Sequence, residues 1–290
     1  MPTSNVVLNE NNLSLNGIFN ASSQSGPYNK LYLTTGSQSL VGKKVALQKL
    51  NLYYSWPNIN ETNNTFSISW PTGVAAYSNF SVKIPSNTNF ATIAELNDYL
   101  QTVMIANKLY AINSTTGDFL YFMSIAANPN IYGVNIVQAL VPTSTPVGYT
   151  TPVGFLGWPS VSRTMRFISD NSDFNLLIGY QANTTFDGNT SAITYNSSFT
   201  PQFSPVSSFN IHVNIASNPL ALNNDNTIIY TSTTRDTKFG SILSIEPNNI
   251  IWYDISSNFN TIIVSFTDQS GRALQIQDPQ ISIVLLLSDI

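Results

Sequence analysis

The sequence predicts an all-β fold: an antiparallel single jelly-roll sandwich with one inserted helix at about 93–106 and a long loop excursion at about 142–205. Three observations lead to this expectation. Apolar and polar residues alternate from one end of the chain to the other. The alternating strand and helix of a parallel sheet do not occur. The most apolar segment, 281–287, comes at the end of the chain.

Half-buried strands account for the alternation, because successive side chains of a strand point to opposite faces of its sheet. Turn-forming residues separate the strands, for example in WPTG at 70–73 and NPN at 128–130. The run Val45–Tyr54 changes parity between Leu47 and Leu50, which predicts a β-bulge. The strands expected from alternation run through 66–70, 80–84, 119–125, 209–215 and 262–266.

One segment has helical spacing instead. Thr92 and Glu95 have the spacing of a capping box, with Thr at the N-cap and Glu at the third helical position. Apolar residues then recur every three or four positions, so we expect a helix over about 93–106. A shorter helix is expected near Ser172–Leu177.

The excursion at 142–205 opens with a near-repeat, TPVGY at 145–149 and TPVGF at 151–155. Its prolines cannot donate to a strand ladder, so an ordered loop that carries aromatic residues is expected. Tyr149, Phe155 and Trp158 are therefore candidate subunit-contact aromatics. The alternative is a long loop that packs over its own barrel.

The apolar ending predicts how the sandwich closes. In a jelly roll, late strands pair with early ones, so the segment 281–287 is expected between early strands of one sheet, covered on both faces. Residues 1–25 contain few core residues and are expected to form an N-terminal arm that orders on contact with neighbouring molecules. The remainder, 26–290, is expected to be one jelly-roll domain with the insertion 142–205.

Composition narrows the class of protein. Only 9% of the 290 residues are charged, against a typical ~25%, and aromatic residues reach 12%. Such a surface suits lasting contact with other subunits. No basic patch is present that would bind nucleic acid, no cysteine is present, and no apolar run approaches the ~20 residues of a membrane helix. The first residues lack the pattern of a signal peptide.

The chain has few titratable residues that could form a catalytic site, so neither an enzyme nor a cofactor is expected. His212, the only histidine, is expected to face solvent or an interface. Asp170, Asn171 and Asp173 form the best local cluster for calcium, although helix capping explains them more simply. Asp268 opens the sequence DQSG, which is interpreted as a hairpin turn.

Several segments resemble penton-type minor capsid proteins of virophages and polinton-like (Maverick) viruses. They are AELNDYLQTVMIANKLYAI (94–112), GVNIVQALVPTSTP (133–146), SPVSSFNIHVNI (204–215), FGSIL (239–243) and TIIVSFTDQSGRALQIQDPQISIVLLL (261–287). The resemblance implies a single jelly roll that forms pentamers at the vertices of an icosahedral virion. It also implies a major capsid protein with two jelly rolls as partner, and assembly inside the host cell.

Two functions of different classes follow. The first is a structural capsid subunit, the pentameric vertex protein, whose mechanism is assembly with identical copies. The alternative is a glycan-binding β-sandwich of a viral fibre or lectin type, in which Tyr149, Phe155 and Trp158 would stack on sugar rings.

Overall fold

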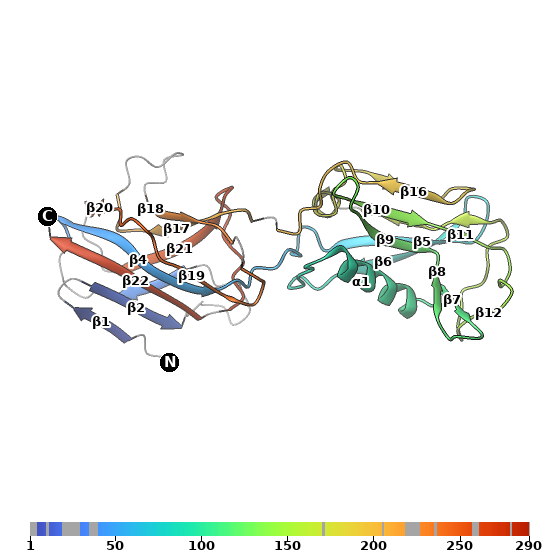
Figure 1. The fold of residues 1–290 in the computed structure, drawn as a ribbon, viewed down its shortest axis with the longest axis horizontal. Coiled ribbons are helices and arrows are strands. Elements are labelled where there is room, and N and C mark those ends of the chain that lie inside the picture. The colour runs from blue at the N-terminus through green and yellow to red at the C-terminus, as the bar shows by residue number, and fades with distance from the viewer. Residues whose placement is uncertain are drawn as a thin grey trace. The chain divides into compact units, whose positions relative to one another are not determined.

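The computed structural model describes residues 5–9, 12–18, 30–34, 40–169, 172–204, 206–217, 227–234, 237–256, 261–278 and 280–289. The chain divides into two compact units (Figure 1). Met1–Trp56 and Val206–Ile290 form the first, called the sandwich unit below. Pro57–Pro205 form the second, the inserted unit. Each unit has a hydrophobic core of its own.

The sandwich unit consists of two antiparallel sheets. The first runs in the order β1 (Asn5–Asn9), β2 (Asn12–Ile18), β22 (Gln280–Asp289), β4 (Lys43–Tyr53) and β19 (Ile242–Ile245), and β20 (Tyr253–Asp254) also pairs with β4. The second runs β18 (Ile228–Ser232), β17 (Phe209–Val213), β21 (Thr261–Asp268) and β3 (Lys30–Thr34).

The strand order of this unit confirms the jelly roll. Eight of its strands define this order along the chain: β2, β3, β4, β17, β18, β19, β21 and β22. Each connection crosses between the sheets except that from β17 to β18, which pair with each other, and the first strand pairs with the last. One sheet then holds the first, last, third and sixth of these strands, and the other holds the second, seventh, fourth and fifth. This is the double Greek-key order of a jelly roll.

The last strand closes the sandwich as expected. Ile283 lies opposite Leu15 of β2 on one side and opposite Leu50 of β4 on the other. Ile281, Ile283 and Leu285 are buried in the core, because they point toward the second sheet. The expected cover on both faces is only partly present, since the intervening Val284 and Leu286 are half-buried.

The β-bulge lies where the parity of the sequence changes. Val284 pairs with Lys49 and the next residue, Leu285, pairs with Leu47, so Gln48 is the extra residue on β4. This insertion lets both Leu47 and Leu50 enter the core although they are an odd number of residues apart.

The inserted unit is built from several small antiparallel sheets. Its four-stranded sheet runs β15 (Thr185–Phe186), β14 (Arg166–Ile168), β5 (Thr65–Pro71), β6 (Tyr77–Lys83). A three-stranded sheet runs β16 (Ile193–Asn196), β10 (Gly133–Gln138), β9 (Met123–Asn128). Another runs β12 (Tyr149–Thr150), β7 (Tyr110–Asn113), β8 (Phe119–Tyr121), and β11 (Leu140–Val141) pairs with β13 (Arg163–Thr164).

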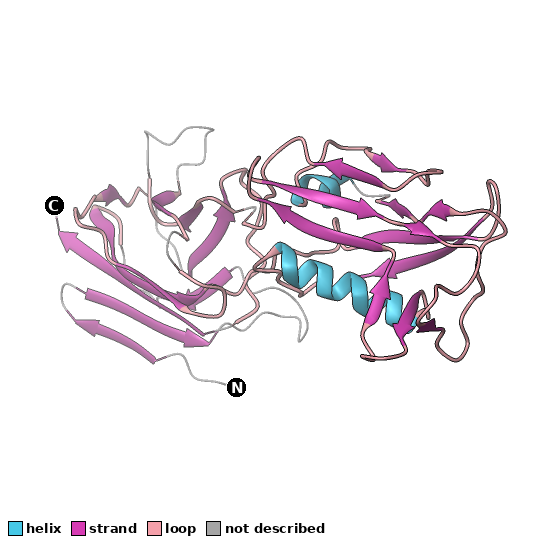
Figure 2. Cartoon of the chain, turned by 45° about the vertical axis from the view of Figure 1, so that its right-hand side comes forward, coloured by secondary structure: helices cyan, strands magenta, loops and turns pink. Residues whose placement is uncertain are grey.

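Both expected helices are confirmed, and both lie in the inserted unit (Figure 2). Helix α1 spans Ile93–Ala106, and the Thr92 side chain accepts a hydrogen bond from the Glu95 backbone N–H. The Glu95 carboxylate accepts from the N–H of Ala91, one residue before the N-cap. Helix α2 spans Ser172–Leu177. Beyond it, Tyr180 donates through its hydroxyl to the Tyr195 carbonyl at 2.7 Å, and burial raises the pKa of Tyr180.

The division of the chain differs from the expected one. The excursion at 142–205 is not a loop on a barrel, because β13, β14, β15 and β16 within it pair with strands of the inserted unit. The inserted unit begins at Pro57, so the expected strands at 66–70, 80–84 and 119–125 lie outside the jelly roll. Period-2 alternation cannot reveal this, since it is the same in either unit.

Two smaller expectations also need correction. Within the expected arm 1–25, β1 and β2 pair with each other, and β2 also pairs with β22, so these stretches are strands of the first sheet. The expected strand at 119–125 is broken at Phe122, between β8 and β9. The two strands belong to different sheets, since β8 pairs with β7 and β9 pairs with β10, and the buried Phe122 ring between them packs against Trp70 and Trp158.

Candidate contact surfaces

His212 is buried on β17. This corrects the expectation that it faces solvent or an interface, which came from its place among the polar residues that alternate with apolar ones in this strand. Only 6% of the residue is accessible. Nδ1 lies 3.1 Å from Thr227 Oγ1, and Nε2 lies 2.8 Å from Thr267 Oγ1. The hydroxyls of Thr267 on β21 and of Thr227, just before β18, thus hold the ring in the sheet. These contacts give His212 a structural role, because buried polar groups need hydrogen-bond partners.

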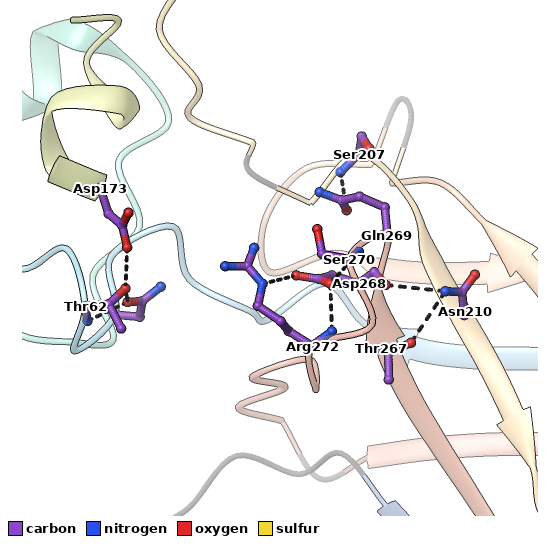
Figure 3. A network of polar contacts seen from close by, with 10 residues as sticks. Thr62, Asp173, Ser207, Asn210, Thr267, Asp268, Gln269, Ser270 and Arg272 are labelled. Atoms are coloured by element: carbon purple, nitrogen blue, oxygen red, sulfur yellow. Dashed lines mark hydrogen bonds and ion pairs between the residues drawn. The ribbon is translucent and has the colours of Figure 1, made fainter. Parts of the chain in front are cut away.

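The DQSG segment forms the expected hairpin turn, shown in Figure 3. The Asp268 carboxylate is buried: Oδ1 accepts from the backbone N–H groups of Ser270 at 2.8 Å and Arg272 at 2.9 Å. Its Oδ2 accepts from Arg272 Nε at 2.9 Å. Asn210 Nδ2 donates to the Asp268 carbonyl at 3.3 Å. The carboxylate therefore organises the turn after β21.

The calcium cluster is described only in part. Asp173 Oδ2 accepts a hydrogen bond from Thr62 Oγ1 at 3.1 Å (Figure 3). Asp170 and Asn171 lie outside the described residues, so calcium binding stays a prediction. Within the described residues, no group of three or more His, Cys, Asp or Glu side chains could hold a metal ion. Nor does that part of the chain contain a helix long and apolar enough to cross a membrane.

The near-repeat at 145–155 folds into two similar turns. The Tyr149 N–H donates to the Pro146 carbonyl, and the Phe155 N–H donates to the Pro152 carbonyl, each at 3.1 Å. Gly148 and Gly154 have φ angles of 83° and 82°, which is the position-three geometry of a type II turn. Val147 and Val153 occupy the second positions and are 101% and 96% exposed.

The candidate aromatics fold inward behind these turns. Phe155 and Trp158 are half-buried, with ring centroids 4.7 Å apart, and both contact the buried Trp70. Trp70 Nε1 donates to the Gly157 carbonyl at 2.9 Å, and Trp158 Nε1 donates to Thr145 Oγ1 at 2.9 Å. Tyr149 is half-buried on β12. As subunit contacts the three stay a prediction, and their main visible role is to hold the loop.

The large apolar side chains that the loop exposes are aliphatic. The turn between β5 and β6 lies beside it, because the Ser160 N–H donates to the Thr72 carbonyl at 3.3 Å. Together the two segments form what we call the apolar tip, whose exposed side chains are Val74, Val147, Val153, Leu156 and Val161.

The sandwich unit has a second apolar surface, which was not predicted from the sequence. It follows one edge of the first sheet of the sandwich unit, where β19 and the segment before β20 run along β4. Each side chain of this apolar edge is at least 40% exposed: Phe239, Ile242, Ile250, Ile251 and Trp252. The run Ile250-Ile251-Trp252 after two asparagines was the signal that could have revealed it.

Comparison with known proteins gives a likeness in structure but none in sequence. No protein-family profile matches the chain, and no curated protein sequence matches it. The chain is similar to the crystal structure of a mavirus penton protein. The TM-score is 0.39 and the identity 14%, over 91% of this chain and 92% of that chain. The assignment of the jelly roll rests on the strand order of the sandwich unit rather than on this likeness.

Proposed function

We propose that the chain is a structural subunit of an icosahedral viral capsid and that it forms the pentameric vertex. The apolar edge carries this proposal. A jelly roll is common to capsid and lectin domains, so the fold alone does not choose between them. Large apolar side chains beside an open sheet edge are a liability for a solitary protein, and they mark a surface that other molecules cover.

The apolar edge suits contact with an identical copy. Among the described residues β19 pairs with β4 alone, so its other side has backbone groups open to a neighbour. Phe239 also contacts Tyr54, whose ring lies 4.7 Å from that of Trp56 in the core, so the edge rests on rigid packing. A five-fold ring needs a heterologous contact, in which the edge of one copy meets a different surface of the next, and growth stops when the rotation between copies closes the ring.

The free energy gained by burying the apolar edge is enough for assembly only as part of a larger interface. Complete burial of a large apolar side chain is worth about 1.5–3 kcal/mol. The five side chains of the apolar edge are about half exposed, so each contributes about 1 kcal/mol on burial. The few charges of the chain, 9% of its residues, lower the cost of removing the surrounding surface from water.

A double jelly-roll major capsid protein, in a virion assembled inside the host cell, is the proposed further partner.

The test is a pair of substitutions in the apolar edge. Ile251→Asp with Trp252→Asp would place two charges in the contact, so we expect a monomer where the unmodified chain forms a closed oligomer. Val41→Asp is the matched control, because Val41 is also exposed in the sandwich unit, at 48%, before β4. Light scattering after size exclusion gives the mass. An unmodified chain that is monomeric at every concentration, or an edge variant that still assembles, would refute the proposal.

A further inference from the structure

The apolar tip of the inserted unit has a composition unlike that of an ordinary loop region. Residues 62–82 and 119–162, which supply all of its turns, contain no Asp, Glu, Lys, Arg or His. Asp118 and Arg163 border the second stretch, and the Asp118 carboxylate accepts a hydrogen bond from Thr116 Oγ1 at 2.6 Å. The exposed surface of the tip is therefore uncharged, and its exposed apolar side chains lie among neutral polar ones such as Thr145, Thr150 and Ser160.

The tip is also held in place before it meets any partner. Gly148 and Gly154 fix the two type II turns. The Gly148 carbonyl accepts from the Ser114 N–H at 2.8 Å, which joins one turn to the hairpin between β7 and β8. The other turn stands on the Trp70, Phe155 and Trp158 rings. Binding would therefore order few additional side chains, which is the main advantage of a preformed surface.

We propose that the apolar tip inserts into the interfacial layer of a lipid bilayer. Val147 and Val153 project from separate turns, and nothing within the described residues covers them. Lipid chains can surround a projecting side chain on all sides, whereas a protein partner needs a matching pocket for each. The absence of charge agrees with this choice, because charged groups are costly in hydrocarbon. Tyr149 and Trp158 lie half-buried behind the valines, and such aromatics favour the membrane–water boundary.

This inference goes beyond the proposed function and does not depend on it. A single tip offers few apolar side chains, so one chain should bind membranes weakly and reversibly. Several tips on one closed oligomer would bind together, and linked sites can exceed single-site affinity by about 10²–10⁴-fold. The edge variant Ile251→Asp with Trp252→Asp therefore separates the two ideas: as a monomer it should bind vesicles, but more weakly than the oligomer.

The experiment is flotation of the full chain with phosphatidylcholine vesicles, with and without phosphatidylserine. We expect binding to both vesicle types, changed less than about twofold by 0.5 M salt, since exposed charges that salt would screen are missing from the tip. Val147→Asp with Val153→Asp should reduce the bound fraction at least about tenfold, because each carboxylate opposes insertion. The control Val41→Asp should bind as the unmodified chain does. Circular dichroism should confirm that all variants are folded.

A labelled variant supplies a second readout. The chain contains no cysteine, so Val153→Cys gives a unique position for an environment-sensitive fluorophore. We expect a blue shift on mixing with neutral vesicles. No binding to any vesicle, binding only to phosphatidylserine vesicles at low salt, or an unaffected double-Asp variant would each overturn the proposal. Two results together would make the tip a subunit contact instead: the unmodified chain does not float with vesicles, and the double-Asp variant has a smaller oligomer mass.

Discussion

Asn58 Nδ2 donates a 2.9 Å hydrogen bond to the backbone carbonyl of Phe203, 145 residues further along the chain. The same amide group donates to the Phe90 carbonyl at 2.7 Å, and Asn58 Oδ1 accepts from the Phe90 N–H at 3.0 Å. Asn58 is 2% exposed. One buried side chain thus ties the beginning of the inserted unit to its end.

Replacement of this side chain should loosen the inserted unit. Asn58→Ala leaves two carbonyls and one N–H without their partners, and each such buried group costs about 1–3 kcal/mol. We expect the free energy of unfolding of the inserted unit to fall by about 3 kcal/mol. Hydrogen exchange of the α1 and β5 amides would measure it. Asn79→Ala, at an exposed position of β6, is the control and should change little; equal effects of the two substitutions would contradict the role of Asn58.

The same geometry predicts that the inserted unit is separable. Its two ends meet at Asn58 and Phe203, and its core includes no residue of the sandwich unit. Residues 57–205 expressed alone should fold, and the sandwich unit should fold when 58–203 are replaced by a short Gly/Ser linker. Dispersed amide signals in NMR spectra of both proteins are the expected result. A collapsed spectrum for the 57–205 protein would show that the two units depend on each other.

The closing strand offers a sharp comparison between adjacent positions. Ile283 is fully buried between β2 and β4, whereas Val284 is half-buried on the other face. Ile283→Ala should destabilise the sandwich unit by about 2–5 kcal/mol, the usual range for such a cavity. Val284→Ala should cost less than about 1.5 kcal/mol because less surface is buried. Urea denaturation measures both, and a larger loss at Val284 would place the closing strand in the wrong register.

The turn after β21 should depend on the carboxylate more than on the cation. The Asp268 side chain is 7% exposed, and it accepts three hydrogen bonds from within the turn, whereas the Arg272 side chain is 72% exposed. Asp268→Ala should cost about 2 kcal/mol through two unpaired backbone N–H groups. Arg272→Ala should cost less than about 1 kcal/mol, since exposed ion pairs contribute little. Thermal melts in low and high salt would separate the two, and a stronger effect of Arg272→Ala would contradict this ranking.

The sequence predicted the local elements better than their grouping. Helix α1 has the expected bounds because its capping residues and its apolar spacing agree. The parity of the apolar residues predicted the bulge between Leu47 and Leu50, and the strand order of a jelly roll together with the apolar content of 281–287 predicted the central place of β22. The boundary at Pro57 was not, because alternating strands of the two units look alike in sequence. Strands as short as β13 and β15 are too brief to show a period.

The contact surfaces were harder to predict. Aromatic residues drew attention to Tyr149, Phe155 and Trp158, but large rings gain most from burial, and two of the three pack on Trp70. The fully exposed side chains of the loop are instead Val147 and Val153, which lie at the tips of turns and have no neighbours to contact. Exposure depends on the turns and on which elements lie nearby, and residue type alone does not supply that information.

The central claim is that copies of this chain close into a ring through the sandwich unit. Electron micrographs of the purified full chain test it most directly, together with its mass in native mass spectrometry. We predict five-fold rings with about five times the 31.8 kDa of one chain. A single 31.8 kDa species at all concentrations, or particles of three-fold symmetry, would contradict it.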